Sequence, residues 1–270
     1  MVVQHNLSAM NTNRQMGVVT SALQKSTEKL SSGYKINRAG DDAAGLSISE
    51  KMRSQIRGLN KASDNAQDGI SLIQVAEGAL NETHSILQRM NELATQAAND
   101  TNTSVDRQSI KDEIEQLNEE LDRISSTTQF NKQDLLTGKF SGKLQVGALE
   151  GQTMDLKIST AVSSTGLKVK DIKVSTNENA GKAMKSIQDA IESVSKQRSK
   201  LGAIQNRLEH TINNLDTNAE NTQAAESRIR DTDMADEMVQ YSKNNILSQA
   251  GQSMLAQANQ QTQGVLSLLQ

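Results

Sequence analysis

The feature that most constrains this chain is an apolar repeat that alternates steps of four and three residues. The repeat runs from Ile48 to Ala97, and twelve of its fifteen positions are apolar. Such a spacing keeps one side of a helix against a partner helix, as in a coiled coil. The sequence therefore predicts one long helix over residues 48–97 with a continuous apolar seam.

Two further stripes follow the same alternation. One runs from Ile110 to Ile124, and the other from Met184 to Ala219 in the C-terminal half of the chain. Amphipathic helices bury such stripes against one another. We therefore expect a mainly α fold, a long antiparallel helical bundle or coiled coil that pairs N- and C-terminal segments, with the polar stretch 99–104 as the turn between the first two helices.

The helical period fails between Thr127 and Asn177. Glycines divide this stretch into short alternating pieces, KLQVGAL and TMDLKIS among them, and this pattern is typical of strands joined by turns. We expect one or two β-hairpins, a small insert that decorates the bundle and does not form a second large domain.

Composition excludes several classes of protein. Aromatic residues make up 1% of the chain, and there is no Trp, Pro or Cys. Without cysteine there are no disulfides and no thiolate metal sites. The net charge of −3 argues against binding of nucleic acid, which needs a basic face. The opening stretch lacks the basic start and apolar core of a signal peptide, and no apolar run is long enough to span a membrane. We therefore expect no membrane partner, and a protein that is either cytoplasmic or exported by a route that recognises another signal.

No catalytic or cofactor-binding pattern is present. His5, His84 and His210 fit no metal-ligand spacing. The acidic pairs at residues 41–42 and 231–233 stand at expected helix starts, where carboxylates cap free N–H groups. No nucleophile elbow, P-loop or zinc-protease motif occurs. The sequence therefore predicts a protein that is not an enzyme and needs no cofactor.

The two ends of the chain predict assembly. Residues 7–30 suit a helix, and a second helix leads to the apolar end VLSLLQ. Ordering these ends costs on the order of 1–2 kcal/mol for each residue, which two thin helices rich in Gln and Asn offset poorly. We expect both ends to be disordered or fraying in the monomer and to fold against identical chains.

Long sequence motifs at both ends resemble those of bacterial flagellins. They are LSSGYKINRAGDDAAGLSISEKMRSQIRGL at 30–59, NELATQAANDTN at 91–102 and TTQFN at 127–131 in the first half. In the second half they are KLGAIQNRLEHTINNL at 200–215, ESRIRDTDMADEM at 226–238 and SQAGQSMLAQANQ at 248–260. The chain is similar to a short member with the two inner domains only. Many relatives carry a proline before VLSLL, where this chain reads QQTQG.

The resemblance implies a domain organisation. Residues 1–41 and 229–270 would form the inner core domain, as helix and linker from each end. Residues 42–177, with a hairpin region at about 130–177, and residues 178–228 would form the bundle domain. The terminal helices, 1–37 and 234–270, would pair coaxially in the filament core.

The resemblance also implies function and partners. The chain would be secreted through the flagellar type III export apparatus, held at its C-terminal helix by an export chaperone, and would polymerise into the extracellular flagellar filament for motility. Filament-cap and hook-junction proteins would contact it. The residues expected to carry polymerisation are the apolar ones of the terminal helices: Leu7, Met10, Leu23, Leu30, Ile246, Leu247, Ala250, Met254, Leu255, Val265, Leu266, Leu268 and Leu269.

A second implied partner is a host protein, Toll-like receptor 5. The patch that family members present to it is matched by Leu87, Gln88, Arg89, Leu93, Gln96 and Glu113. Arg89 and Leu93 are four residues apart, so we expect them together on the flank of the first stripe, outside its seam. Contacts with neighbouring subunits or the next helix are an equally simple role for the same residues.

Two other readings remain open from the sequence. A hook–filament junction protein has flagellin-like ends but does not grow long filaments alone. A cytoplasmic coiled coil of the chemoreceptor type is also rich in Ala, Gln and Ser, but it would need a membrane span or a docking domain.

Overall fold

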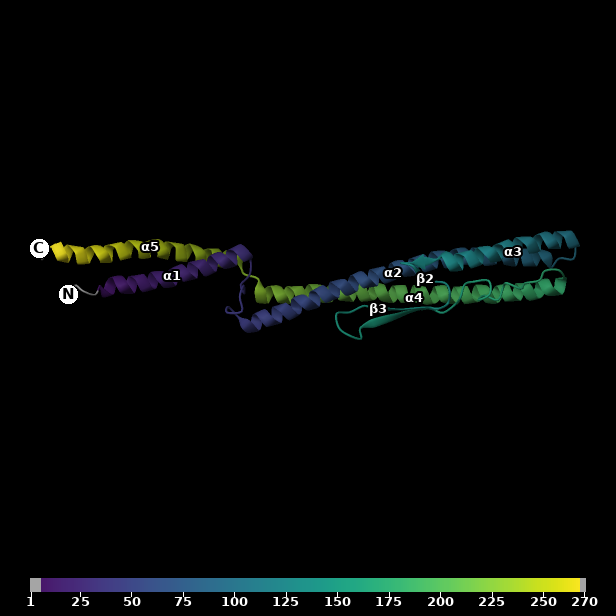
Figure 1. Ribbon diagram of the computed structural model, residues 1–270, viewed down its shortest axis with the longest axis horizontal. Helices are drawn as coiled ribbons and strands as arrows, with labels where there is room; N and C mark the ends of the chain where they lie inside the picture. The colour runs from purple at the N-terminus through teal and green to yellow at the C-terminus, as the bar shows by residue number, and fades with distance from the viewer. Residues whose placement is uncertain (1–5, 268–270) are drawn as a thin grey trace. The chain divides into compact units, whose positions relative to one another are not determined.

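A computed structural model describes the backbone of residues 6–267 and the side chains of residues 6–261. Within that range the chain forms five helices and two short strand pairs (Figure 1). The helices are α1 (Leu7–Ser32), α2 (Ala43–Ala97), α3 (Ser104–Thr127), α4 (Asn177–Arg230) and α5 (Met234–Ser267). The predicted mainly α fold and its small β insert are confirmed.

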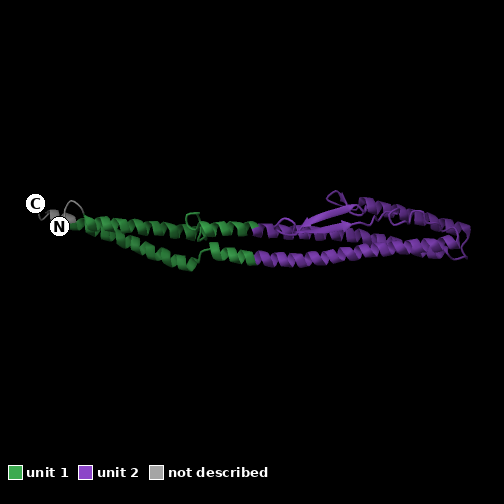
Figure 2. Cartoon of the chain, turned by 90° about the horizontal axis from the view of Figure 1, so that it is seen from below, with its two compact units in different colours: residues 1–54, 221–270 green, residues 55–220 purple. Residues whose placement is uncertain are grey.

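The chain divides into two compact units, coloured separately in Figure 2. Unit 1 holds residues 1–54 and 221–270, and unit 2 holds residues 55–220. Each unit joins an N-terminal to a C-terminal segment, because α2 and α4 each contribute to both. The division of the chain at residues 41, 177 and 228 stays a prediction.

In unit 2, α2 and α4 pack antiparallel. Ser63 donates a hydrogen bond to Asp216 at 3.0 Å, while Thr95, near the other end of α2, contacts the sulfur of Met184 at 3.3 Å. All twelve positions of the predicted seam from Leu59 to Ala97 are buried. The four-three periodicity therefore located the face of α2 that packs in the core from Leu59 on. The prediction was wrong for the first three seam positions, since Ile48 is 46% exposed, Met52 is half-buried and Gln55 is exposed.

Helix α3 folds back along α2 after a turn at residues 98–103. Thr103 and Asp106 close the start of α3 as a capping box, in which each side chain binds the other residue's backbone N–H. Ile114 and Leu121 of its apolar stripe are at most 2% exposed. The predicted turn and second helix are confirmed.

The insert between α3 and α4 contains β1 (Gln129–Phe130) paired with β2 (Gln133–Asp134), and β3 (Phe140–Gln145) paired with β4 (Thr153–Ile158). Its side chains Leu135, Leu136 and Leu156 are fully buried in the same core as the helices. The insert therefore does more than decorate the bundle, since it contributes to the core. Its apolar residues cover helix surface that would otherwise face water.

Glycine allows one close approach of the insert to α2. A Cβ on Gly58 would lie 2.8 Å from the Cβ of Ala148, in the loop between β3 and β4. The missing side chain thus lets that loop lie directly on the helix.

In unit 1, α1 and α5 form an antiparallel pair. Asn6 donates to the carbonyl of Ala258 at 2.9 Å, and Lys29 lies 3.4 Å from Glu237 at the other end of the pair. The linkers beside them also meet, since Lys35 N donates to Arg230 O at 2.7 Å.

The acidic pairs of this unit act as the sequence predicted. Asp42 accepts from Gly45 N at 2.9 Å at the start of α2, and Asp233 accepts from Ala235 N at 2.9 Å at the start of α5. Asp41 instead accepts from the backbone N–H of Asn37 and Arg38 and closes the linker turn. Carboxylates at these places satisfy free N–H groups.

Candidate functional surfaces

The described residues contain no group of His, Asp and Glu able to hold a metal ion. Of the three histidines, His84 lies 3.0 Å from Gln88, His210 is exposed on α4, and His5 lies outside the described residues. Within that same range no helix is long and apolar enough to cross a membrane.

Unit 1 presents most of the exposed apolar surface. Over residues 6–261, thirteen large apolar side chains are exposed, and ten of them belong to this unit. Among the same residues, the buried apolar ones of this unit are Ile36 and Ala258. A unit with so little core and so many exposed apolar side chains is typical of a subunit that completes its packing with a partner. The ten are Leu7, Met10, Val18, Ile48, Met234, Met238, Val239, Ile246, Leu247 and Met254.

The predicted polymerisation residues fall on two sides of the helix pair. Leu23, Leu30 and Leu255 are half-buried, whereas Leu7 and Met10 are 71% and 64% exposed. Ile246, Leu247, Ala250 and Met254 are exposed on α5. Leu268 and Leu269 lie outside the described residues, as do the side chains of Val265 and Leu266.

Sequence reasoning did not assign five exposed apolar residues of unit 1 to assembly: Val18 on α1, Ile48 on α2, and Met234, Met238 and Val239 on α5. The available signal was a large apolar side chain on the polar side of a helix. Val18 lies eleven residues, or about three turns, after Leu7 and on the same face of α1.

A concavity of about 440 Å³ lies between α1 and α5. A Cβ on Gly251 would lie 3.8 Å from Met16, so the two helices are close at this point. Apolar side chains from both helices make it suited to an apolar side chain of a partner. It is lined by Asn11, Thr12, Gln15, Met16, Val19, Leu247, Ala250, Gly251 and Met254.

The predicted receptor patch centres on an ion-pair network in unit 2. The Arg89 guanidinium on α2 lies 2.9 Å from Glu113 of α3 and 3.2 Å from Glu92. These carboxylates, Glu113 first, raise the pKa of Arg89 above its ordinary value. Gln88, Arg89, Gln96 and Glu113 are all exposed.

Two residues of that patch are not on the surface. Leu87 is fully buried and Leu93 is 2% exposed, both in the main core. The expectation that Leu93 lies outside the packed face was wrong, because two further elements, α3 and the insert, pack on α2 and bury more of its surface than one seam. These leucines can only position their exposed neighbours.

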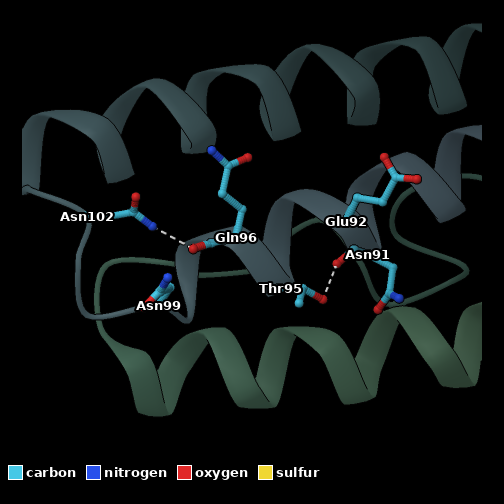
Figure 3. Close-up of a pocket in the computed structure, with 6 residues that line it drawn as sticks. All are labelled: Asn91, Glu92, Thr95, Gln96, Asn99 and Asn102. Carbon is cyan, nitrogen blue, oxygen red and sulfur yellow. Dashed lines mark hydrogen bonds between the residues drawn. The ribbon is translucent and has the colours of Figure 1, made fainter.

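Next to this patch α2 carries a polar pocket of about 630 Å³, shown in Figure 3. It is lined by Asn91, Glu92, Thr95, Gln96, Asn99 and Asn102. Asn102 donates to the carbonyl of Gln96 at 2.5 Å, and Thr95 donates to the carbonyl of Asn91 at 2.8 Å. Gln96 directs its side chain to a partner with its own donors and acceptors, whereas Glu92 is already paired with Arg89.

Paired long helices, an exposed apolar terminal unit and no catalytic constellation in the described residues define a helical structural protein. A family model described as the bacterial flagellin N-terminal helical region matches residues 3–141, and one described as the C-terminal helical region matches residues 184–269. The chain belongs to the bacterial flagellin family.

Relatives support this membership along the whole chain. Flagellin of Halalkalibacterium halodurans is 58% identical over 273 residues, and flagellin of Bacillus subtilis is 52% identical over 304 residues, with all of each chain covered. The crystal structure of Bacillus cereus flagellin matches with a TM-score of 0.51 at 32% identity, covering 60% of this chain and 94% of that one.

One further structure shares the fold alone. A putative flagellar hook-associated protein from Vibrio parahaemolyticus has a TM-score of 0.60 at 12% identity and covers 71% of this chain and 100% of that one. The full-length flagellin relatives favour the filament subunit over the junction protein, and family membership excludes the chemoreceptor reading. The chain is a structural subunit of the flagellar filament and not an enzyme, as predicted.

Proposed function

We propose that copies of this chain assemble into the filament through unit 1, by burying the exposed apolar faces of α1 and α5 against neighbouring copies. The observation that carries the proposal concerns the part of unit 1 whose side chains are described, where ten large apolar side chains are exposed and two apolar residues, Ile36 and Ala258, are buried. Within residues 6–261, these side chains remain exposed in the monomer.

The energy scale supports this assignment. Complete burial of a Val, Leu, Ile or Met side chain contributes about 1.5–3 kcal/mol. Association costs about 4–15 kcal/mol in lost translational and rotational freedom. Burial of several half-exposed side chains on each side of a contact is therefore sufficient to offset that cost.

The test compares seeded polymerisation of two double variants. The first variant carries Val239→Gln and Ile246→Gln in unit 1, where each of the two side chains is 67% exposed. In the control, Val105→Gln and Leu149→Gln, the positions are 71% and 67% exposed in unit 2. Depolymerised monomer is mixed with short filament seeds, sedimented and viewed by negative-stain microscopy.

We expect the unit 1 variant to stay in the supernatant and the control to form filaments as the unchanged chain does. A chain truncated before Met234 should also remain soluble. Normal filaments from the unit 1 variant would contradict the proposal, as would equal loss in both double variants.

The same α5 surface is the proposed binding site of an export chaperone before assembly. Its exposed Met238, Val239 and Ile246 would otherwise drive premature association in the cell. Export through the flagellar type III apparatus would deliver the chain to the cell exterior, where cap and hook-junction proteins would contact the terminal helices. Loss of chaperone co-purification in the Val239→Gln, Ile246→Gln variant, but not in the Val105→Gln, Leu149→Gln variant, is the expected result.

We also propose that the free monomer is recognised by Toll-like receptor 5 through Gln88, Arg89, Gln96 and Glu113. The support is their common exposure and the Arg89–Glu113 pair, which ties α2 to α3 at 2.9 Å and holds a charged surface in one arrangement. Leu87 and Leu93 would act through packing beneath it.

Substitution of Arg89 by Ala tests the receptor site against a matched pair. Arg123 pairs with Glu120 on α3 and is also exposed, so Arg123→Ala is the control. We expect Arg89→Ala to weaken binding of the monomer to the receptor ectodomain by about 10-fold or more, in the range of an interface hot spot. Equal affinities of the two variants would remove Arg89 from the site.

A further inference from the structure

The outer face of the β3–β4 hairpin carries lysines without partners. Along β4, Met154, Leu156 and Ile158 point into the core, so Asp155 and Lys157 point outward, level with Lys143 and Ser141 of β3. Lys143, Lys157 and Lys139, just before β3, are exposed. None of them forms an ion pair in the described part of the chain, and one aspartate, Asp155, stands among the three.

The hairpin is held firmly to the helices beneath it. Asn65 of α2 donates to the carbonyl of Gln145 at 3.1 Å, and Gln197 of α4, itself 2% exposed, lies 3.5 Å from the carbonyl of Lys157. Side chains from two helices therefore tie both edges of the ribbon. A rigid ribbon presents its lysines with a smaller loss of entropy on binding.

Some lysines on the helices of the same unit do have a local partner. Lys111 pairs with Glu115 on α3, and Lys196 pairs with Glu192 on α4, both one helical turn apart. Such pairs satisfy their charges locally. The hairpin lysines have no such local partner, and they form a surface of excess positive charge on a chain whose net charge is −3.

A matching acidic face lies on α3. This helix holds seven carboxylates and three cationic side chains. Asp112, Glu115 and Glu119 are exposed and, at spacings of three and four residues, share one face. Glu119 has no ion pair among the described residues, whereas Asp112 accepts a hydrogen bond from Gln108 and Glu115 pairs with Lys111.

We propose that the lysine face of the hairpin (Lys139, Lys143 and Lys157) binds the acidic face of α3 (Asp112, Glu115 and Glu119) of a second copy of this chain. The inference rests on the proposed self-assembly and adds a contact made by unit 2. The apolar faces of unit 1 supply association energy, and this charged contact selects the lateral register between copies.

The spacing of the two faces agrees with this pairing. Lys143 and Lys157 are diagonal neighbours on an antiparallel pair, about 7–8 Å apart. Neighbouring acids on α3 are about 5–6 Å apart, a difference that a lysine side chain spans easily. Two different surfaces that meet in this way form a heterologous contact, which repeats into an open polymer.

The experiment is a charge swap. One variant carries Lys139→Glu, Lys143→Glu and Lys157→Glu, and a second carries Asp112→Lys, Glu115→Lys and Glu119→Lys. A third carries all six changes. The control, Lys185→Glu, Lys196→Glu and Lys200→Glu on α4, changes the net charge as the first variant does. Thermal melting of each monomer checks folding, and the measured quantity is the critical concentration for seeded assembly at low salt.

We expect each triple reversal to raise the critical concentration by roughly 10-fold or more, because like charges then face each other. The variant with all six changes should return the critical concentration to within about threefold of that of the unchanged chain. The α4 control should have a critical concentration in the same range. The inference is overturned if the variant with all six changes does not assemble although its monomer melts normally. Unchanged assembly of both triple variants also overturns it.

Two other results have separate meanings. If the unchanged chain does not assemble with seeds, the proposed function itself fails. The hairpin variant could also assemble normally but no longer bind to a heparin column. That result would overturn the contact between copies, and it would indicate that the lysine face binds a polyanion.

Discussion

The guanidinium of Arg230 lies over the ring of Tyr34, 4.8 Å from its centroid, at the point where the two linkers of unit 1 meet. The same guanidinium lies 3.2 Å from Glu50 of α2. Backbone hydrogen bonds flank this contact on both sides, from Lys35 N to Arg230 O and from Thr232 N to Gly33 O. One side chain thus joins both linkers and the start of α2.

Replacement of Tyr34 by Ala should loosen the two linkers. An arginine–aromatic contact of this kind contributes about 0.5–1 kcal/mol at partly exposed sites. We expect the amide hydrogens of Lys35 and Thr232 to exchange about 2- to 5-fold faster, as the local opening free energy falls by that amount. Tyr241→Ala on α5 is the control, and unchanged exchange at both amides in Tyr34→Ala would show that the ring does not stabilise the linkers.

Two glycines of α2 should respond to alanine in opposite directions. A Cβ at Gly78 would meet nothing within 4 Å, so Gly78→Ala should stabilise unit 2 by about 0.5–1 kcal/mol through helix propensity. A Cβ at Gly58 would lie 2.8 Å from the Cβ of Ala148, so Gly58→Ala should destabilise the unit by about 1–3 kcal/mol through overpacking. Urea unfolding followed by circular dichroism measures both, and a stabilising Gly58→Ala would refute the close packing of the 146–152 loop.

The capping box of α3 should show in a pH titration. A side-chain hydrogen bond from Thr103, reinforced by its backbone N–H, holds the pKa of Asp106 below its ordinary value of 3.8. A depressed pKa stabilises the folded state above the unfolded value, and this contribution is lost as pH falls through the folded value. We expect Thr103→Val to move the carbon-detected NMR titration of Asp106 upward towards 3.8. An unchanged midpoint would mean that the hydroxyl does not hold the carboxylate.

The terminal helices should gain protection only on assembly. Unit 1 has few buried apolar residues, so we expect the amide hydrogens of α1 and α5 in the monomer to exchange far faster than those of α2 between Leu59 and Ala97. In filaments the same amides should become protected, because burial against neighbouring copies then stabilises both helices. Hydrogen exchange with mass spectrometry on monomer and filament measures this. Strong protection of α1 and α5 in the monomer would contradict the expected fraying of the ends.

The sequence by itself determined the long helices and the face of α2 that packs. A four-three alternation of apolar residues predicts both a helix and the face on which it packs, because this spacing matches the number of residues in a helical turn. Every seam position from Leu59 to Ala97 is buried for that reason. The caps at Asp42 and Asp233 were readable in the same way, since capping depends on residues close in sequence.

Tertiary structure alone decided what lies against the rest of each helix. Leu93 is buried because elements far along the chain cover a second side of α2, and no local period reports that contact. The burial of Leu135, Leu136 and Leu156 has the same origin, as does the close approach of Ala148 to Gly58. Val18 and Val239 are exposed for the opposite reason, because the helices that carry them are covered on fewer sides. In unit 1 only one helix packs on each partner, so their apolar surface stays open to neighbouring copies.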